Sequence, residues 1–208
     1  MEIISYIGRA QNLFLKKIFY VSHLYSEDKI VYLTFDDGPE HGITEFILNE
    51  LNCYGFKGTF FCRGDNAERH PELLTLLQEQ GHIVGNHTYS HNHAYYENAR
   101  AYYMDVERAN KVLNTQLFRP PHGSLTIISW LLLHRKYKII YWSLNSGDSD
   151  LEAFDYNRSL DNLKSKTKKG DIILFHFCHR HENETKKLLP VYLKWLYENN
   201  YRCEIINL

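Results

Sequence analysis

Apolar residues along the 208-residue chain follow two patterns: short continuous runs, and longer stretches in which they recur every three or four positions. Short runs bounded by turn residues predict buried strands, and the wider spacing predicts helices with one buried face. The strands expected from this pattern span residues 29–35, 57–62, 82–87, 137–144, 171–177 and 201–206. The expected helices span residues 44–53, 70–81, 94–113, 125–134, 160–168 and 184–199. This alternation predicts an α/β fold with a parallel sheet, closed or partly closed into a barrel.

Residues 1–28 precede the first expected strand and do not continue the alternation. Their apolar residues are interrupted by charged and amide side chains, so the sequence predicts neither a signal peptide nor a transmembrane segment. A chain of this length suits one well-buried core. We therefore expect an N-terminal segment, residues 1–28, that packs on a single domain spanning residues 29–208.

Charge and cysteine usage narrow the range of partners and settings. The chain has 24 Lys plus Arg against 25 Asp plus Glu, a formal net charge of −1, so no broad positive field attracts phosphate backbones. No nucleic-acid partner is expected. The four cysteines have no close paired spacing, which favours free thiols in a reducing compartment over a disulfide framework. We expect a cytoplasmic protein, and the sequence does not indicate its oligomeric state.

Polar residues follow three of the expected strands at the point where each strand ends. Asp36 and Asp37 follow the run "VYLTF", His87 and His91 follow "HIVG", and His176 follows "DIILF". The carboxyl ends of parallel strands meet at one edge of a sheet, where active sites of α/β proteins collect. Each group alone has an ordinary explanation: a turn, a surface histidine pair, or a hydrogen-bonded core histidine. Together they form a candidate site.

These residue types match the needs of a mononuclear zinc hydrolase. Such an enzyme uses three protein ligands, an open position for water, and a separate base and acid. His87 and His91 can share one metal if the three residues between them form a helical turn. Asp37 can supply the third ligand, and its neighbour Asp36 can take a proton from the attacking water. His176 can give a proton to the leaving group.

Five motifs carry a family resemblance. They are "TFDDGP" at 34–39, "GTFF" at 58–61, "HTYSH" at 87–91, "RPPHG" at 119–123 and "LFH" at 174–176. Their order and spacing resemble polysaccharide deacetylases of the NodB-homology type, similar to carbohydrate esterase family 4, from about residue 30 to the end. The resemblance implies a distorted (β/α) barrel in a single domain. It also implies a divalent metal, with zinc expected and cobalt or nickel as alternatives.

The resemblance assigns roles that agree with the chemistry of the residues. Asp36 matches the general base, and Asp37, His87 and His91 match the metal ligands. His176 matches the general acid.

Three further positions gain roles only through the resemblance. Arg119 matches the arginine that holds the catalytic aspartate, where its charge keeps that carboxylate ionised. The backbone N–H of His122 is expected to stabilise the oxyanion. Leu174 is expected to shape the pocket for the acetyl methyl group.

One motif departs from the family pattern. Relatives carry an Asp-x-x-Asp-Trp stretch, and this chain has "NSGDS" at 145–149. Asn145 replaces the aspartate that raises the pKa of the catalytic histidine in relatives, and Ser149 replaces the tryptophan that walls the acetyl pocket. The second aspartate remains as Asp148. Either the pKa of His176 is lower here than in relatives, or Asp148 supplies the missing charge.

Three other histidines are expected to take no part. His93 lies two positions beyond His91 and is expected to face away from the site. His179 and His181 follow the candidate acid and could line the mouth of the pocket or be solvated, and the second is expected.

The resemblance implies removal of N-acetyl groups from an oligo- or polysaccharide containing N-acetylglucosamine, such as peptidoglycan or chitin. The same metal site would also serve an O-acetyl esterase or a hydrolase of non-sugar amides. A non-catalytic sugar-binding protein is an alternative of another class, favoured only by the altered "NSGDS" run. The retained base, ligands, arginine and acid favour an enzyme.

Overall fold

The computed structural model describes residues 21–208. The prediction for the N-terminal segment therefore lies outside the described residues as far as position 20. Its described end contacts the domain, because Val21 forms a parallel bridge with Ile140 and His23 an antiparallel bridge with Asp171. Within residues 21–208, no helix combines the length and apolar character needed to cross a membrane.

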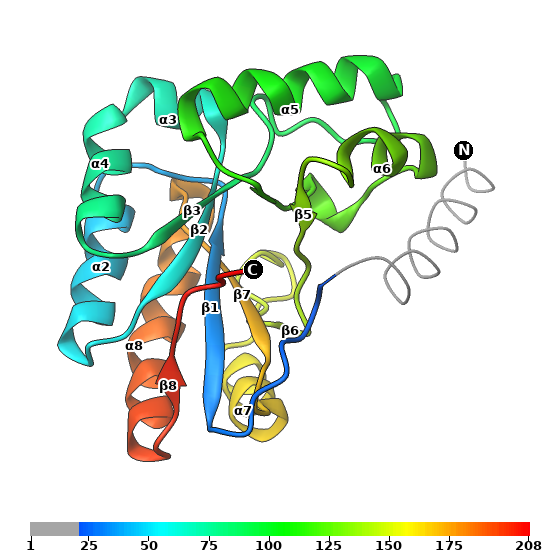
Figure 1. Cartoon of the computed structure of the whole chain (residues 1–208). Helices are drawn as coiled ribbons and strands as arrows, with labels where there is room; N and C mark the ends of the chain where they lie inside the picture. Colours follow the sequence, from blue (N-terminus) through cyan, green and yellow to red (C-terminus); the bar gives the residue numbers. More distant parts are fainter. Residues whose placement is uncertain (1–20) are drawn as a thin grey trace.

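The strands form one sheet in which every paired strand is parallel (Figure 1). The order is β5-β4-β3-β2-β1-β7-β6, and β8 pairs with the first residues of β1. Adjacent parallel strands are connected through helices, as the alternating pattern predicts. The strands are β1 Ile30–Asp36, β2 Gly58–Cys62, β3 Ile83–Asn86, β4 Leu117–Phe118, β5 Lys138–Ile139, β6 Leu144–Asn145, β7 Ile172–His176 and β8 Arg202–Cys203.

The barrel is only partly closed, and a crossing segment, residues 140–143, spans the gap. β5 pairs with β4 at one edge of the sheet, and β6 pairs with β7 at the other. The prediction of one continuous strand over residues 137–144 is wrong for this reason. Between the two short strands, Tyr141 N donates to Val21 O at 2.8 Å and Ser143 N to Ile172 O at 2.9 Å. The α/β class and the partly closed barrel are confirmed.

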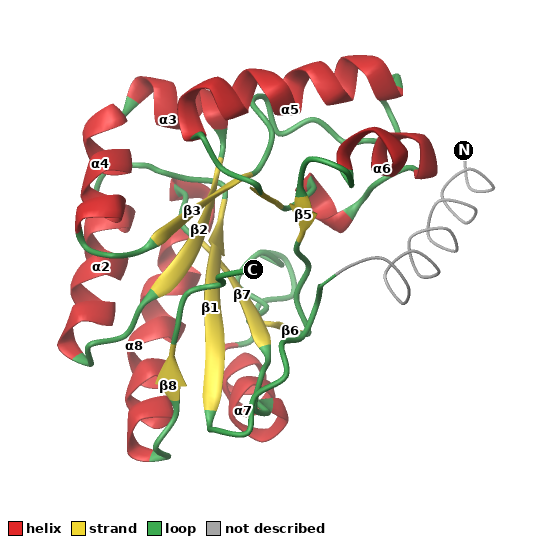
Figure 2. Cartoon of the chain, viewed as in Figure 1, coloured by secondary structure: helices red, strands yellow, loops and turns green. Residues whose placement is uncertain are grey.

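Helices cover the outside of the sheet (Figure 2), with α2, α4 and α8 on one side of the strands and α6 on the other. The helix predicted from residue 94 begins only at Ala99, because the Asn98 side chain caps it by accepting a hydrogen bond from Ala101 N at 2.9 Å. A short helix, α3, was not predicted because six residues are too few to show a period. The helices are α2 Ile43–Cys53, α3 Gly64–Arg69, α4 Pro71–Glu79, α5 Ala99–Leu113, α6 Ile127–Leu133, α7 Tyr156–Lys166 and α8 Glu182–Glu198.

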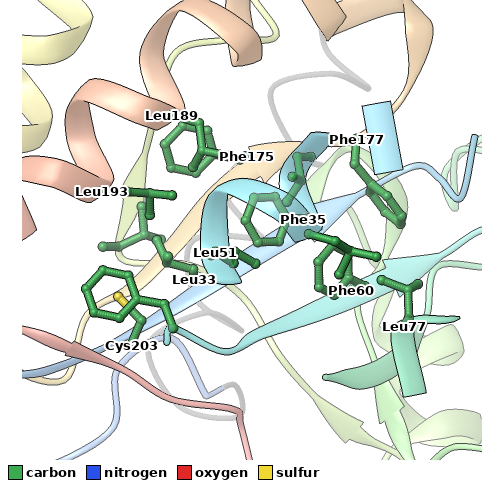
Figure 3. Close-up of a cluster of buried hydrophobic side chains, with 14 of the residues drawn as sticks. Leu33, Phe35, Leu51, Phe60, Leu77, Phe175, Phe177, Leu189, Leu193 and Cys203 are labelled. Carbon is green, nitrogen blue, oxygen red and sulfur yellow. The ribbon is translucent and has the colours of Figure 1, made fainter. Parts of the chain in front are cut away.

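Strand β1 separates the large apolar core under the helices from the interior of the barrel. Leu33 and Phe35 belong to the large apolar cluster under the helices (Figure 3), where the Phe35 and Phe60 rings stack 4.7 Å apart. Side chains alternate along a strand, so Thr34 and Asp36 point to the opposite face. Both are buried there against polar partners. The strand that anchors the outer core thus also carries a carboxylate into the barrel.

The turn after β1 packs tightly against the end of β7 at Gly38. A Cβ atom on Gly38 would lie 2.4 Å from the Phe177 ring and 2.6 Å from the Phe177 carbonyl oxygen. In the same region Phe177 N donates to the Asp36 carbonyl oxygen at 2.9 Å. Only glycine allows this close approach of two backbones.

Gly38→Ala is expected to lower the free energy of unfolding by about 1–3 kcal/mol, the usual cost of overpacking. Denaturant unfolding followed by circular dichroism measures this change. Gly55→Ala is a useful companion, because Gly55 has a φ of 65° and no atom within 4 Å of an added Cβ, so it reports backbone strain without a clash. A Gly38→Ala variant within about 0.5 kcal/mol of the parent protein would show that the turn moves aside freely.

Candidate active site

The carboxyl ends of β1, β3 and β7 surround a pocket of about 600 Å³. A larger open depression of about 910 Å³ lies near Tyr54 and Tyr201 and contains none of the predicted site residues. Arg119 and Asp148 are fully buried and contact residues of the pocket. The predicted residues that line the pocket are Asp36, Asp37, His87, His91, His122, Leu174 and His176.

Asp37, His87 and His91 bring three donor atoms together, all within 4.8 Å of one another. Asp37 Oδ1 lies 2.9 Å from His91 Nε2 and 3.4 Å from His87 Nε2. His87 Nδ1 lies 2.7 Å from the Arg119 carbonyl oxygen, which can only accept a hydrogen bond. His87 therefore carries its proton on Nδ1 and presents the Nε2 lone pair to Asp37.

The loop that carries the two histidines is a bend, so the predicted helical turn is wrong. Thr88 and His91 both have positive φ, 63° and 59°. The Thr88 hydroxyl accepts a hydrogen bond from His91 N at 3.0 Å, which tightens the bend. The two imidazole rings end with centroids 5.1 Å apart. His87 and His91 are therefore brought together by a bend with left-handed backbone conformations and not by one face of a helix.

Asp105 on α5 holds this loop, and no sequence signal indicated it. Its carboxylate accepts hydrogen bonds from Tyr89 N at 3.0 Å and Ser90 N at 3.1 Å. The Ser90 hydroxyl also donates to it at 2.7 Å. A helix 15 residues farther along the chain therefore orients the loop.

The donor set fits a divalent metal. Asp37 Oδ1 is buried, and within residues 21–208 no group donates a well-aligned hydrogen bond to it. Burial alone would raise the pKa of Asp37, but its contacts with His87 and His91 hold that pKa well below the usual range. An ionised carboxylate oxygen beside two imidazole nitrogens is a ligand combination that zinc and similar ions prefer.

Asp36 has a different partner from its neighbour Asp37. Arg119 Nη1 donates to Asp36 Oδ1 at 2.8 Å and to the Thr34 hydroxyl at 2.8 Å. The second oxygen of Asp36 lies 3.8 Å from His87 Nε2, on the pocket side. One oxygen of Asp36 is thus fixed by the Arg119 guanidinium, while the other faces His87.

The crossing segment of the barrel holds Arg119 in place. Arg119 Nε donates to Ile140 O at 3.3 Å, and Nη2 donates to Tyr141 O at 3.0 Å. Its guanidinium lies 4.1 Å from the centroid of the Phe61 ring. The buried arginine therefore satisfies the carbonyl groups of Ile140 and Tyr141, which lie between β5 and β6.

His176 pairs with Asp148, which resolves the alternative left open by the sequence. His176 Nδ1 donates to Asp148 Oδ1 at 2.8 Å, and the backbone N of His176 donates to Asp148 Oδ2 at 2.7 Å. Thr185 Oγ1 donates to the same carboxylate at 2.9 Å. Burial alone would lower the pKa of His176, but the charge and hydrogen bond of Asp148 raise it to about 9.

Asn145 takes no part in that pair. Its side chain is exposed and accepts a hydrogen bond from Gly147 N at 2.8 Å, so it stabilises the turn. Of the two alternatives, the contacts favour the one in which Asp148 supplies the charge beside His176. Ser149 lines the pocket where relatives were expected to place tryptophan.

Trp142 supplies an aromatic wall that the sequence reasoning missed. It lines the same pocket as Leu174, and a Cβ on Gly123 would lie 2.7 Å from its ring. Trp142 lies in the crossing segment. Its place beside the site depends on the gap in the barrel, which the apolar run did not reveal.

Two expectations about neighbouring histidines are wrong. His93 does not face away: its ring stacks on His122 with centroids 5.1 Å apart, and His122 in turn lies 4.7 Å from His91. His181 is not solvated but buried, with its ring 4.9 Å from that of His176. The side chain of His179 is 62% exposed, as expected.

His122 has a left-handed backbone, with φ 57°, in the turn Pro121–Gly123. Burial and the neighbouring histidines lower its pKa to about 4, so the ring is neutral at pH 7. A neutral ring can stand beside a cation without repelling it. The predicted role of its backbone N–H stays a prediction.

The sequence is similar to that of known polysaccharide deacetylases. A sequence model described as polysaccharide deacetylase matches residues 24–136. A peptidoglycan-N-acetylglucosamine deacetylase of Bacillus cereus is 31% identical over 154 residues, 70% of this chain and 55% of that protein. The chain thus spans little more than half of that relative's length. The peptidoglycan-N-acetylmuramic acid deacetylase PdaA of Bacillus subtilis is 27% identical over 85% of this chain and 71% of its own.

A solved peptidoglycan N-acetylglucosamine deacetylase has the same fold. It superposes with a TM-score of 0.80 and 26% identity, covering 93% of each chain. The family match ends at residue 136, so the placement of Asp148, Leu174 and His176 rests on the geometry of this chain. The matched span covers more than half of the sequence and contains the Asp37, His87 and His91 cluster. The chain therefore belongs to the polysaccharide deacetylase family.

Proposed function

We propose that this protein is a metal-dependent hydrolase that removes N-acetyl groups from a glycan containing N-acetylglucosamine, such as peptidoglycan. One observation carries the proposal. Asp36 and His176, each held by its own charged partner, line one pocket together with the three candidate metal ligands. Asp36 is paired with Arg119, and His176 is paired with Asp148.

Asp37, His87 and His91 would hold the metal, with zinc favoured and cobalt or nickel as alternatives. Such an ion would polarise the acetyl carbonyl and lower the pKa of a bound water. Asp36 accepts the proton of the attacking water through its pocket-facing oxygen. Arg119 fixes the orientation of this carboxylate, because Arg119 Nη1 donates to its other oxygen at 2.8 Å.

His176 supplies the proton that the leaving amine needs. Because Nδ1 donates to Asp148, the second ring nitrogen is the atom that gives its proton to the sugar nitrogen. A pKa near 9 keeps the imidazole protonated at neutral pH. His176 therefore carries the proton to be donated before the amide bond breaks.

The relatives and the lining of the pocket support this substrate class. The relatives are named as deacetylases of N-acetylglucosamine and of N-acetylmuramic acid in peptidoglycan. Leu174 and Trp142 add apolar surface suited to an acetyl methyl group. The cytoplasmic location expected from the sequence stays a prediction.

Purified protein loaded with one equivalent of zinc is expected to release acetate from N-acetylglucosamine oligomers or peptidoglycan fragments. Asp36→Asn is expected to retain the metal and to lose about a hundredfold to ten-thousandfold in kcat, because the amide keeps the shape but accepts no proton. Acetate quantification and metal analysis measure both quantities. Release from O-acetylated sugars alone would establish an esterase instead, and glycan binding with no release would establish a sugar-binding protein.

The alkaline limb of the pH–rate profile tests the acid. Asp148→Asn is expected to move this limb to lower pH, because the carboxylate raises the pKa of His176 and its loss lets the ring deprotonate earlier. Asn145→Asp is the matched control and is expected to move the limb far less, since that side chain is exposed and turned to Gly147 N. A limb that responds to Asn145→Asp and not to Asp148→Asn would contradict the assignment.

A further inference from the structure

The two oxygens of Asp37 face different sets of ligand atoms. Oδ1 lies beside His87 and His91, as described above. Oδ2 lies on the other side, where the Cys178 thiol donates to it at 3.8 Å. Asp37, Cys178 and His181 form a second group whose ligand atoms all lie within 4.8 Å of one another. A carboxylate in this position can bridge two cations.

His181 provides an independent sign of a ligand site. The residue is only 6% exposed, and its Nδ1 has no hydrogen-bond partner within the described part of the chain. Burying a polar nitrogen without a partner costs free energy, and a bound ion would remove that cost. His181 and Cys178 both line the pocket that holds Asp37.

Nearby charge and ligand chemistry favour a thiophilic cation. Glu40 lines the same pocket and accepts a hydrogen bond from His179 N at 2.6 Å, which brings a second carboxylate close to Asp37 and Cys178. Sulfur, imidazole and carboxylate are the three ligand types that zinc uses. A thiol ligand also distinguishes this group from the set with His87 and His91.

We propose that Cys178, His181 and Asp37 form a second binding site for a thiophilic divalent cation such as zinc, and that its occupation inhibits the enzyme. On binding, the Cys178 thiol gives its proton to water and the sulfur forms the bond to the ion. The inhibition, although not the binding, rests on the proposed function.

Inhibition follows from the position of the second site. The His181 ring lies 4.9 Å from the ring of His176, the proposed acid. A cation held by His181 stands beside His176 and occupies the side of the pocket where the leaving amine receives its proton. The second ion thus blocks proton donation by His176, and the first ion stays bound to His87 and His91.

Cobalt titration of the metal-free protein separates the two sites, because only a thiolate ligand gives an intense near-ultraviolet charge-transfer band. The parent protein is expected to bind two ions per chain, with the band growing only with the second. Cys178→Ser is expected to keep the first ion, to lose the band and to bind the second at least about tenfold more weakly. Cys53→Ser is the matched control, because Cys53 is a free, exposed thiol on α2 outside the pocket.

Three outcomes of this titration overturn the proposal. One ion at saturation excludes a second site, and a band that appears with the first ion places Cys178 in the primary site. A band that survives Cys178→Ser assigns it to another cysteine. If Cys178→Ser also loses the first ion, His181→Ala decides, because it must keep the first ion and weaken the second.

Acetate release with added zinc tests the inhibition separately. Turnover is expected to be highest near one equivalent of zinc and to decrease as the second site fills. In Cys178→Ser, excess zinc is expected to cause no such decrease. A second ion that binds without lowering turnover overturns the inhibitory role. Absence of acetate release at one equivalent refutes the proposed function instead, while the cobalt titration still decides whether the second site exists.

Discussion

The buried ion pair between Arg119 and Asp36 joins the parts of this structure that make a site. Arg119 is completely buried and reaches from the end of β4 to β1 and to the crossing segment through Ile140 and Tyr141. Removing either partner of a buried pair leaves an uncompensated charge, at a cost of about 3–5 kcal/mol. The gap in the barrel, the orientation of Asp36 and the lining of the pocket therefore depend on one another.

This ion pair also gives two adjacent carboxylates, Asp36 and Asp37, different surroundings. Asp36 is held by a cation, whereas Asp37, with φ 86°, turns toward His87 and His91. Neighbouring residues with the same side chain thereby receive different electrostatic surroundings, as the proposed roles of Asp36 as base and Asp37 as metal ligand require. On the opposite side of the pocket Asp148 performs the corresponding task for His176.

The sequence predicted the parts of the site that depend on strand ends and missed those that depend on closure of the barrel. Parallel strands bring their carboxyl ends together, so Asp36, Asp37 and His176 could be grouped from local patterns alone. The run at 137–144 looked like one strand because periodicity does not show that its two ends pair with opposite sheet edges. Trp142 was missed for that reason, and the burial of His181 depends on tertiary packing that no short motif encodes.

A crystal structure of the zinc-loaded protein, with the ion located by anomalous scattering, tests the central claim most directly. The first ion is expected to lie about 2.0–2.2 Å from Asp37, His87 Nε2 and His91 Nε2, the usual range for zinc with oxygen and nitrogen ligands. Asp36 should remain paired with Arg119 and stay outside the coordination sphere. An ion bound by Asp36, or one bound away from these two histidines, would contradict the separation of base and ligand.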